Sequence, residues 1–163
     1  MTYHTFFESP IGPLLLVSDG RALTGLYMNE LVIPVGSAED ADALPFVEAR
    51  LQLAEYFAGG RQTFDLPLAP KGTTFQRILW AFLKDVPYGE TTTYGALARK
   101  MNEPNACRAV GMANGRNPLS IVVPCHRVVG SNGKLTGYSG GLSKKEFLLA
   151  LERGDLFSLA EGV

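Results

Sequence analysis

Short blocks of apolar and polar residues dominate the first third of the chain, and their spacing predicts β-strands. Strands are expected over residues 3–7, 14–17 and 23–28, each rich in aromatic or aliphatic residues. Asp19-Gly20 separates the second strand from the third and is typical of a hairpin turn. The N-terminal region should therefore form a small antiparallel sheet.

The hydrophobic spacing changes after Pro45, a residue well placed in the first turn of a helix. Gly59-Gly60 would end this helix, and residues 61–72, which contain two prolines and a glycine, are interpreted as a linker. The apolar stripe of the helix is best explained as core. Its members are Phe46, Ala49, Leu53, Tyr56 and Phe57.

A second helical region begins at Thr73, which forms a capping-box pattern with Gln76. Apolar residues at helical spacing continue to Val86, and Pro87-Tyr88-Gly89 ends the pattern. Two shorter helices, over residues 91–101 and 105–113, are expected around a tight turn, an arrangement typical of a helix-turn-helix. We therefore divide the chain into domains 1–70 and 71–163.

Charge is distributed unevenly between these two regions. The whole chain has 163 residues and a net charge of −1, but residues 1–70 carry a balance of −6 and residues 71–153 carry +7. Such asymmetry indicates nucleic-acid binding by the basic half, although a solvated basic face would look the same. With 46% hydrophobic residues, the chain is expected to be globular.

Candidate chemistry lies in Pro124-Cys125-His126-Arg127-Val128, which follows an apolar run, Ile121–Val123, interpreted as a short strand. A thiol is a useful nucleophile only as thiolate, and an unperturbed cysteine has a pKa of about 8.5. A neighbouring imidazole can remove the proton directly or through one water. A buried cysteine that packs as a small hydrophobe, beside a histidine that caps a turn, is the simpler explanation of the dipeptide alone.

Four motifs in order strengthen the chemical interpretation: Arg108-Ala109-Val110-Gly111, Asn117-Pro118, the Pro124–Val129 segment and Tyr138-Ser139-Gly140-Gly141. Together they resemble the O6-alkylguanine-DNA alkyltransferase family, the methylated-DNA-protein cysteine methyltransferases. The resemblance runs from about residue 75 to about residue 151. It implies an α/β fold with a small N-terminal antiparallel-sheet and helix domain, ribonuclease H-like, followed by a helix-rich, winged helix-turn-helix-like DNA-binding and catalytic domain.

The same resemblance implies a DNA-repair methyltransferase that moves the alkyl group of O6-alkylguanine in duplex DNA irreversibly to Cys125, so that each molecule acts once. Activity on O4-alkylthymine stays open. His126 would be the base, and Glu146 the carboxylate that orients it. Tyr94 would help to rotate the nucleotide out of the duplex and would protonate guanine, while Arg108 would fill the gap in the base stack. Asn117, a pocket residue, would also be the hinge whose side chain supports the turn leading toward Cys125. The remaining implied DNA and pocket residues are Ala109, Gly111, Tyr138, Ser139 and Gly140.

Several assignments have plain alternatives. Glu146 also completes a capping-box pattern with Ser143 at the start of the last helix. Arg127 is expected to be structural or phosphate-facing, and Cys107 an inert packing thiol. Asn114-Gly115-Arg116 departs from the family pattern at a point where relatives vary, and its effect on the pocket stays open.

Two rival functions remain: a non-catalytic lesion sensor of the same fold, which would lack the acceptor cysteine, and a cysteine hydrolase, which would need an oxyanion hole. No cofactor and no metal are expected, since two cysteines and two histidines are too few for a structural zinc site and no phosphate-binding loop motif is present. The expected partner is double-stranded DNA that contains O6-alkylguanine.

The chain lacks a long apolar run and a secretory signal pattern, so we expect no membrane contact and a cytoplasmic location, or a nuclear one in a eukaryote. A monomer in solution is expected, with contacts between molecules on DNA left open.

Overall fold

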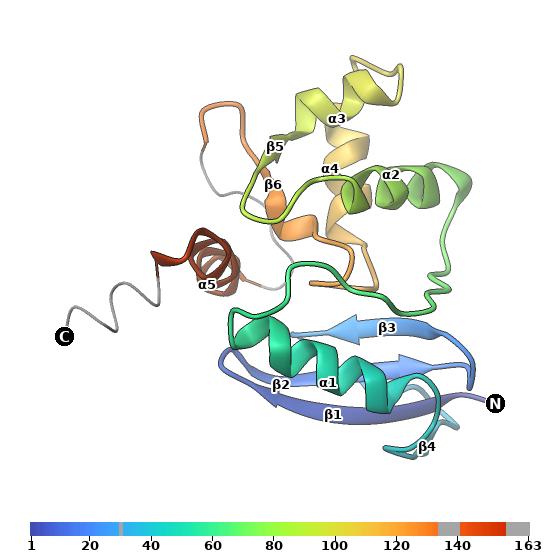
Figure 1. Ribbon diagram of the computed structural model, residues 1–163. Coiled ribbons are helices and arrows are strands. Elements are labelled where there is room, and N and C mark those ends of the chain that lie inside the picture. Colours follow the sequence, from blue (N-terminus) through green and yellow to red (C-terminus); the bar gives the residue numbers. More distant parts are fainter. Residues whose placement is uncertain (30, 134–140, 156–163) are drawn as a thin grey trace. The chain divides into compact units, whose positions relative to one another are not determined.

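A computed structural model of the chain describes residues 1–29, 31–133 and 141–155 and divides into two units (Figure 1). The first unit contains Met1–Lys71 and is built on a sheet with strand order β3-β2-β1-β4. Its strands are β1 (Tyr3–Ser9), β2 (Gly12–Ser18), β3 (Leu23–Tyr27) and β4 (Ala38–Glu39). The first three strands confirm the sequence prediction, and β4 pairs in parallel with β1, whereas the others are antiparallel.

Helix α1 (Phe46–Phe57) lies across this sheet, as Figure 1 shows. The predicted stripe is buried at Phe46, Ala49, Leu53 and Tyr56, and α1 packs on the sheet at β1. The predicted hairpin turn between β2 and β3 is also present, because the Asp19 carboxylate accepts hydrogen bonds from the backbone amides of Arg21 and Ala22.

Two segments from elsewhere in the chain pair with β3. The amide of Leu23 donates to the carbonyl of Pro67, within the region interpreted as a linker. The amide of Leu26 donates to Pro118 and the amide of Ser120 donates back to Leu26, so that Pro118–Ser120 belongs to the first unit. No pattern in the sequence predicts this pairing, which anchors the main chain at Ser120, five residues before Cys125.

The second unit begins with α2 (Thr74–Lys84), whose predicted capping box is confirmed: Thr73 and Gln76 each accept the other's backbone amide. Helices α3 (Tyr94–Lys100) and α4 (Cys107–Gly115) form the expected pair. The indole nitrogen of Trp80 on α2 donates to the carbonyl of Ala113 on α4 at 2.9 Å, so α2 and α4 are fixed to each other.

The rest of the second unit comprises a 3₁₀ turn (Cys125–Arg127), the parallel strand pair β5 (Thr92–Thr93) and β6 (Val128–Val129), and α5 (Leu142–Arg153). The prediction of a strand over Ile121–Val123 was wrong. The chain turns there, and Ile121 adopts a left-handed conformation with φ of 74°. This conformation costs a β-branched residue about 1–3 kcal/mol, and buried Ile121 keeps it because both sides of the turn are anchored.

Candidate functional site

Cys125 begins the 3₁₀ turn and is only 2% exposed. Its backbone amide donates to the carbonyl of Val123 at 2.8 Å, and the amide of Arg127 donates to the carbonyl of Pro124 at 3.0 Å. The turn is thus closed by its own main chain, and β6 continues from it. Because Cys125 is almost completely buried, an electrophile must reach the interior of the protein to react with its sulfur.

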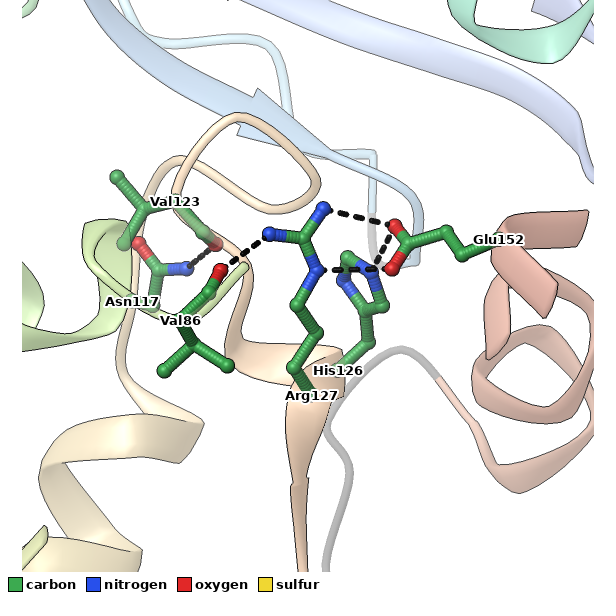
Figure 2. A network of polar contacts seen from close by, with 6 residues as sticks. All are labelled: Val86, Asn117, Val123, His126, Arg127 and Glu152. Carbon is green, nitrogen blue, oxygen red and sulfur yellow. Dashed lines mark hydrogen bonds and ion pairs between the residues drawn. The ribbon is translucent and has the colours of Figure 1, made fainter. Parts of the chain in front are cut away.

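His126, the next residue, is completely buried, and its Nε2 lies 2.7 Å from Oε2 of Glu152 on α5 (Figure 2). The same carboxylate binds Arg127 through both oxygens: Nε of Arg127 donates to Oε1 at 2.8 Å and Nη2 donates to Oε2 at 3.1 Å. One carboxylate from the last helix therefore holds two consecutive residues of the 3₁₀ turn.

Arg127 completes its own hydrogen bonding inside the protein. Its Nη1 donates to the carbonyl of Val86, just beyond α2, at 2.7 Å (Figure 2). Its guanidinium carbon lies 5.7 Å from the ring centroid of Tyr88. The side chain is buried, so the structural interpretation of Arg127 holds and the phosphate-facing one does not. Arg127 ties the end of α2 to the carboxylate of α5.

Electrostatics fix the protonation of this cluster. Burial alone would raise the pKa of Glu152, but hydrogen bonds and charge from His126 and Arg127 outweigh burial and lower the pKa to about 2. Burial lowers the pKa of His126, with smaller contributions from the Arg127 and Lys145 charges, while Glu152 opposes this shift. Near neutral pH the pair is therefore a carboxylate and a neutral imidazole.

The tautomer of His126 follows from its partner. An ionised carboxylate can only accept hydrogen bonds. Nε2 must therefore carry the imidazole proton and donate a hydrogen bond to Glu152. Nδ1 then holds a bare lone pair, and it has no hydrogen-bond partner among the described residues. A buried imidazole with an unused basic nitrogen, next in sequence to a thiol, has what a general base requires.

The prediction that Glu146 orients His126 was wrong, because Glu152 occupies that place. Glu146 is exposed on α5, after its first turn. Its alternative role as half of a capping box was also wrong, since α5 begins after Gly141 with no side-chain cap. The two glutamates lie six residues apart, about a third of a turn out of phase, which directs them to different faces of the helix.

Lys145 was not predicted as a site residue, yet its side chain is completely buried, and Nζ donates to the carbonyl of Val128 at 2.5 Å. Burial lowers the pKa of Lys145, and the negative charge of a Cys125 thiolate opposes that shift. A cation is therefore within electrostatic range of the thiol. The signal in the sequence was the α5 repeat Lys145, Leu148, Leu149 and Glu152, whose spacing predicts one buried helix face.

Two buried asparagines support the segment that leads to Cys125. Nδ2 of Asn117 donates to the carbonyl of Val123 at 2.8 Å (Figure 2), and Nδ2 of Asn114 donates to the carbonyl of Cys125 at 3.3 Å. The first contact agrees with the hinge role implied for Asn117. The second comes from a residue in the segment that departs from the family pattern.

The predicted DNA-contacting residues lie on α3 and α4. Arg108 and Ala109 are exposed on α4, and Tyr94 is half-buried at the start of α3. A Cβ added at Gly111 would meet the Tyr94 ring at 3.9 Å, an ordinary van der Waals contact, so these two positions are neighbours. The predicted pocket residues Tyr138, Ser139 and Gly140 lie outside the described residues.

Within the described ranges, no helix is long and apolar enough to cross a membrane. In the same part of the chain, no cluster of three or more His, Cys, Asp or Glu residues is arranged to hold a metal ion.

The fold and this cluster together define an α/β protein with a helix-turn-helix unit that carries a buried cysteine beside a carboxylate-held histidine. Residues 74–154 match the model of the 6-O-methylguanine DNA methyltransferase DNA-binding domain, and residues 2–70 match the model of the ribonuclease-like domain of the same family. The chain therefore belongs to the 6-O-methylguanine DNA methyltransferase family.

Individual relatives agree along nearly the whole chain. A methylated-DNA--protein-cysteine methyltransferase of Methanosarcina acetivorans is 52% identical over 156 residues, which cover 92% of this chain and 97% of that protein. The crystal structure of Mycobacterium tuberculosis OGT in complex with DNA is similar with a TM-score of 0.89 at 47% identity, covering 94% of each chain. An O6-methylguanine DNA methyltransferase from Methanococcus jannaschii matches with a TM-score of 0.66 at 31% identity, covering 91% of this chain and 93% of that one.

Proposed function

We propose that the protein repairs DNA by transferring the alkyl group of O6-alkylguanine from duplex DNA to Sγ of Cys125, in a single irreversible turnover. The observation that carries this proposal is the position of Cys125 next in the 3₁₀ turn to a neutral, buried His126, whose Nδ1 has no hydrogen-bond partner among the described residues and whose Nε2 is held by Glu152. Membership of the family and the M. tuberculosis relative crystallised with DNA support DNA as the partner.

The proposed reaction begins with loss of the thiol proton from Cys125 to Nδ1 of His126, directly or through one water. The thiolate then attacks the saturated carbon on guanine O6. A carbon–sulfur bond forms, the carbon–oxygen bond breaks, and the electron pair remains on the purine. The hydroxyl of Tyr94 supplies a proton to the departing purine at N3, so that a neutral guanine leaves. The phenolate then regains a proton from solvent, and the His126 imidazolium releases the former thiol proton to solvent, so no net proton is consumed.

Glu152 takes the role that the sequence suggested for Glu146. By accepting a hydrogen bond from Nε2–H it holds the imidazole in the tautomer that exposes a basic Nδ1, and its negative charge stabilises the imidazolium that forms. No metal or organic cofactor enters this scheme. The product is a thioether, which water does not readily hydrolyse, so the protein is consumed.

Burial of the thiol makes extrusion of the target nucleotide necessary. Sγ belongs to a residue that is 2% exposed, and a base within the stack cannot approach it. Exposed Arg108 on α4 is the side chain proposed to fill the gap left by the base, with Ala109 and Gly111 allowing α4 to lie close to the backbone. Asn117 supports the acceptor segment, and Tyr138, Ser139 and Gly140 are proposed to line the guanine pocket.

The location follows from the substrate: a protein that repairs genomic DNA works in the cytoplasm of a prokaryote or in a nucleus. Cys107 and Cys125 are not joined in a disulfide, which suits a reducing compartment. We propose that the protein is a monomer in solution, with contacts between molecules on DNA left open.

The test is incubation with a duplex oligonucleotide that carries one O6-methylguanine, followed by mass analysis of peptides. A methyl group on the peptide that contains Cys125 is expected, with one methyl per protein molecule. Cys125→Ser should abolish transfer, and Cys107→Ser is the matched control, because Cys107 is exposed at the start of α4. Loss of transfer in a folded Cys107→Ser variant would overturn the assignment of the acceptor.

The rival functions give different results in the same experiment. Binding of the lesion without any adduct would indicate a lesion sensor. Repeated turnover of an ester or amide by DNA-free protein would indicate a hydrolase. Either result with intact wild-type protein would contradict the proposed alkyl transfer.

A further inference from the structure

Two side-chain amides hold the two carbonyls that flank the Pro124–Cys125 peptide unit. Asn117 donates to Val123 at 2.8 Å, and Asn114 donates to Cys125 at 3.3 Å. Both carbonyls already accept a main-chain hydrogen bond, from the amides of Cys125 and Val128 respectively. The asparagines thus add a second, sideways restraint to a segment in which Pro124 has no amide proton to contribute.

Asn114 is an energetically unfavourable residue at its position. It lies in the last turn of α4 and is 2% exposed, and its Oδ1 is buried with no hydrogen-bond partner among the described residues. Leaving such an acceptor buried without a hydrogen bond destabilises the folded protein. An apolar residue of similar size would avoid this cost, so stability alone does not account for an asparagine here.

The identity of the donor is fixed by the acceptor. The two ends of an asparagine amide are assigned from hydrogen bonding, and only the NH₂ group can face a carbonyl oxygen favourably. Turning the amide over would set Oδ1 against the carbonyl of Cys125. The bond from Asn114 to Cys125 therefore has one direction.

We propose that Asn114 is a positioning residue for alkyl transfer: it fixes the Cys125 main chain to α4, the helix that carries Arg108, so that the sulfur is aimed at the extruded nucleotide. This inference rests on the proposed function. Its physical basis is that displacement at a saturated carbon requires the sulfur to approach opposite the leaving oxygen, and a misplacement of about 1 Å can cost about a hundredfold in rate.

The hydrogen bond from Asn114 connects the Cys125 main chain directly to α4, the helix that carries Arg108. Asn114 lies six positions after Arg108, less than two helical turns, and α4 is held to α2 by the Trp80 hydrogen bond to Ala113, the residue before Asn114. A nucleotide positioned by α4 and a thiol positioned by the end of α4 therefore share one rigid reference. Neither Asn117 nor the closure of the 3₁₀ turn supplies this connection to the Cys125 carbonyl.

The test compares Asn114→Leu, which keeps the volume but removes the donor, with Gln52→Leu as the matched control. Gln52 is also a buried amide, 2% exposed, and its Nε2 donates to the carbonyl of Asp65 at 3.0 Å in the first unit. Three quantities are measured where each variant is fully folded: the single-turnover rate of methyl transfer from a saturating O6-methylguanine duplex, the affinity for that duplex in a Cys125→Ser background, and the rate of Cys125 alkylation by iodoacetamide.

Asn114→Leu should lower the transfer rate by about tenfold or more, while DNA affinity and the iodoacetamide rate stay within about twofold of wild type. This split is expected because a small reagent needs only a thiolate, whereas the lesion needs a thiolate that is aimed. Gln52→Leu should change none of the three quantities per folded molecule. If Asn114→Leu does not fold, Asn114→Ser, whose hydroxyl is too short to reach the carbonyl, replaces it with the same expectation.

A transfer rate within about twofold of wild type would overturn the positioning role. An equal loss in the iodoacetamide reaction would also overturn it, because Asn114 would then act on activation of the thiol. So would an equal loss in Gln52→Leu. Failure of the wild-type protein to become methylated contradicts the proposed function instead, and the two failures are therefore distinguishable.

Discussion

Nε2 of His126 donates to Oε2 of Glu152 across 2.7 Å, although the two residues are separated by 26 positions in the chain. The partners differ in charge state: Glu152 is ionised by its contacts with His126 and Arg127, and burial keeps His126 neutral. The carboxylate thereby selects one imidazole tautomer, and the last helix becomes part of the site at the 3₁₀ turn.

Replacement of Glu152 by glutamine should both destabilise the protein and slow transfer. Arg127 would lose its buried counter-charge, for which we expect a loss of about 3–5 kcal/mol in the free energy of unfolding. The amide could also accept or donate toward His126, so the tautomer would no longer be fixed. Urea unfolding and single-turnover methyl transfer measure the two effects.

The matched control is Glu146→Gln, which changes the same functional group on the same helix at an exposed position. Its free energy of unfolding should change by about 0.5 kcal/mol or less, with transfer unchanged. A loss of transfer in Glu146→Gln equal to that in Glu152→Gln would contradict the assignment of the carboxylate to residue 152.

The sequence predicted the elements of this site better than their partners. Strands β1 to β3, the stripe of α1 and the Thr73–Gln76 capping box follow from local spacing, and all are present. Cys125 and His126 are adjacent in sequence, so their pairing needed no folding information. Local rules were sufficient wherever the interacting groups lie within a few residues of each other.

Assigning the orienting carboxylate depended on the phase of α5, which the apolar residues Leu148 and Leu149 define. Had the buried face been traced through them, Lys145 and Glu152 would have been placed inward and Glu146 outward. The Ile121–Val123 segment failed for another reason. Its composition favours a strand, but the pairing of Ser120 with Leu26, about ninety residues away in sequence, commits the chain to a turn.

Stability should fall as the pH decreases below about 6.5, because of His126. Burial lowers the folded-state pKa of His126. Below pH 6.5 the unfolded chain therefore binds a proton on this imidazole more readily than the folded protein does. The free energy of unfolding then decreases with falling pH, by up to about 1.4 kcal/mol per pH unit for one group. Glu152 adds a second loss between pH 4.5 and about 2, its unfolded and folded pKa values.

Urea unfolding at several pH values between about 8 and 5 measures the histidine contribution. His126→Gln should flatten the profile in this window, whereas His4→Gln, which removes the chain's other histidine, should leave the slope in place. An unchanged slope in folded His126→Gln protein would show that another group titrates.

Arg108→Ala should impair repair of duplex DNA more than reaction with a free alkylated base. Arg108 is exposed on α4, away from the buried thiol, and its proposed task exists only where a base stack must be filled. Extrusion costs a few kcal/mol, so we expect a loss of roughly tenfold or more with duplex substrate and little loss with free O6-methylguanine. Single-turnover rates on the two substrates provide the comparison, and equal losses on both would contradict this role.

Lys145→Met should reduce the reactivity of Cys125 with every electrophile, in contrast to Asn114→Leu. Lys145 is completely buried, and its ammonium interacts favourably with a Cys125 thiolate. Because such an interaction is mutual, the ammonium also favours the thiolate over the thiol. Without it, the pH at which iodoacetamide alkylates Cys125 at half its maximal rate should shift upward, and methyl transfer near neutral pH should slow in proportion.

Lys144→Met is the control, since it removes the neighbouring charge at a position that is not buried. A pH profile unchanged in folded Lys145→Met protein would mean that the buried cation serves only to hold the Val128 carbonyl.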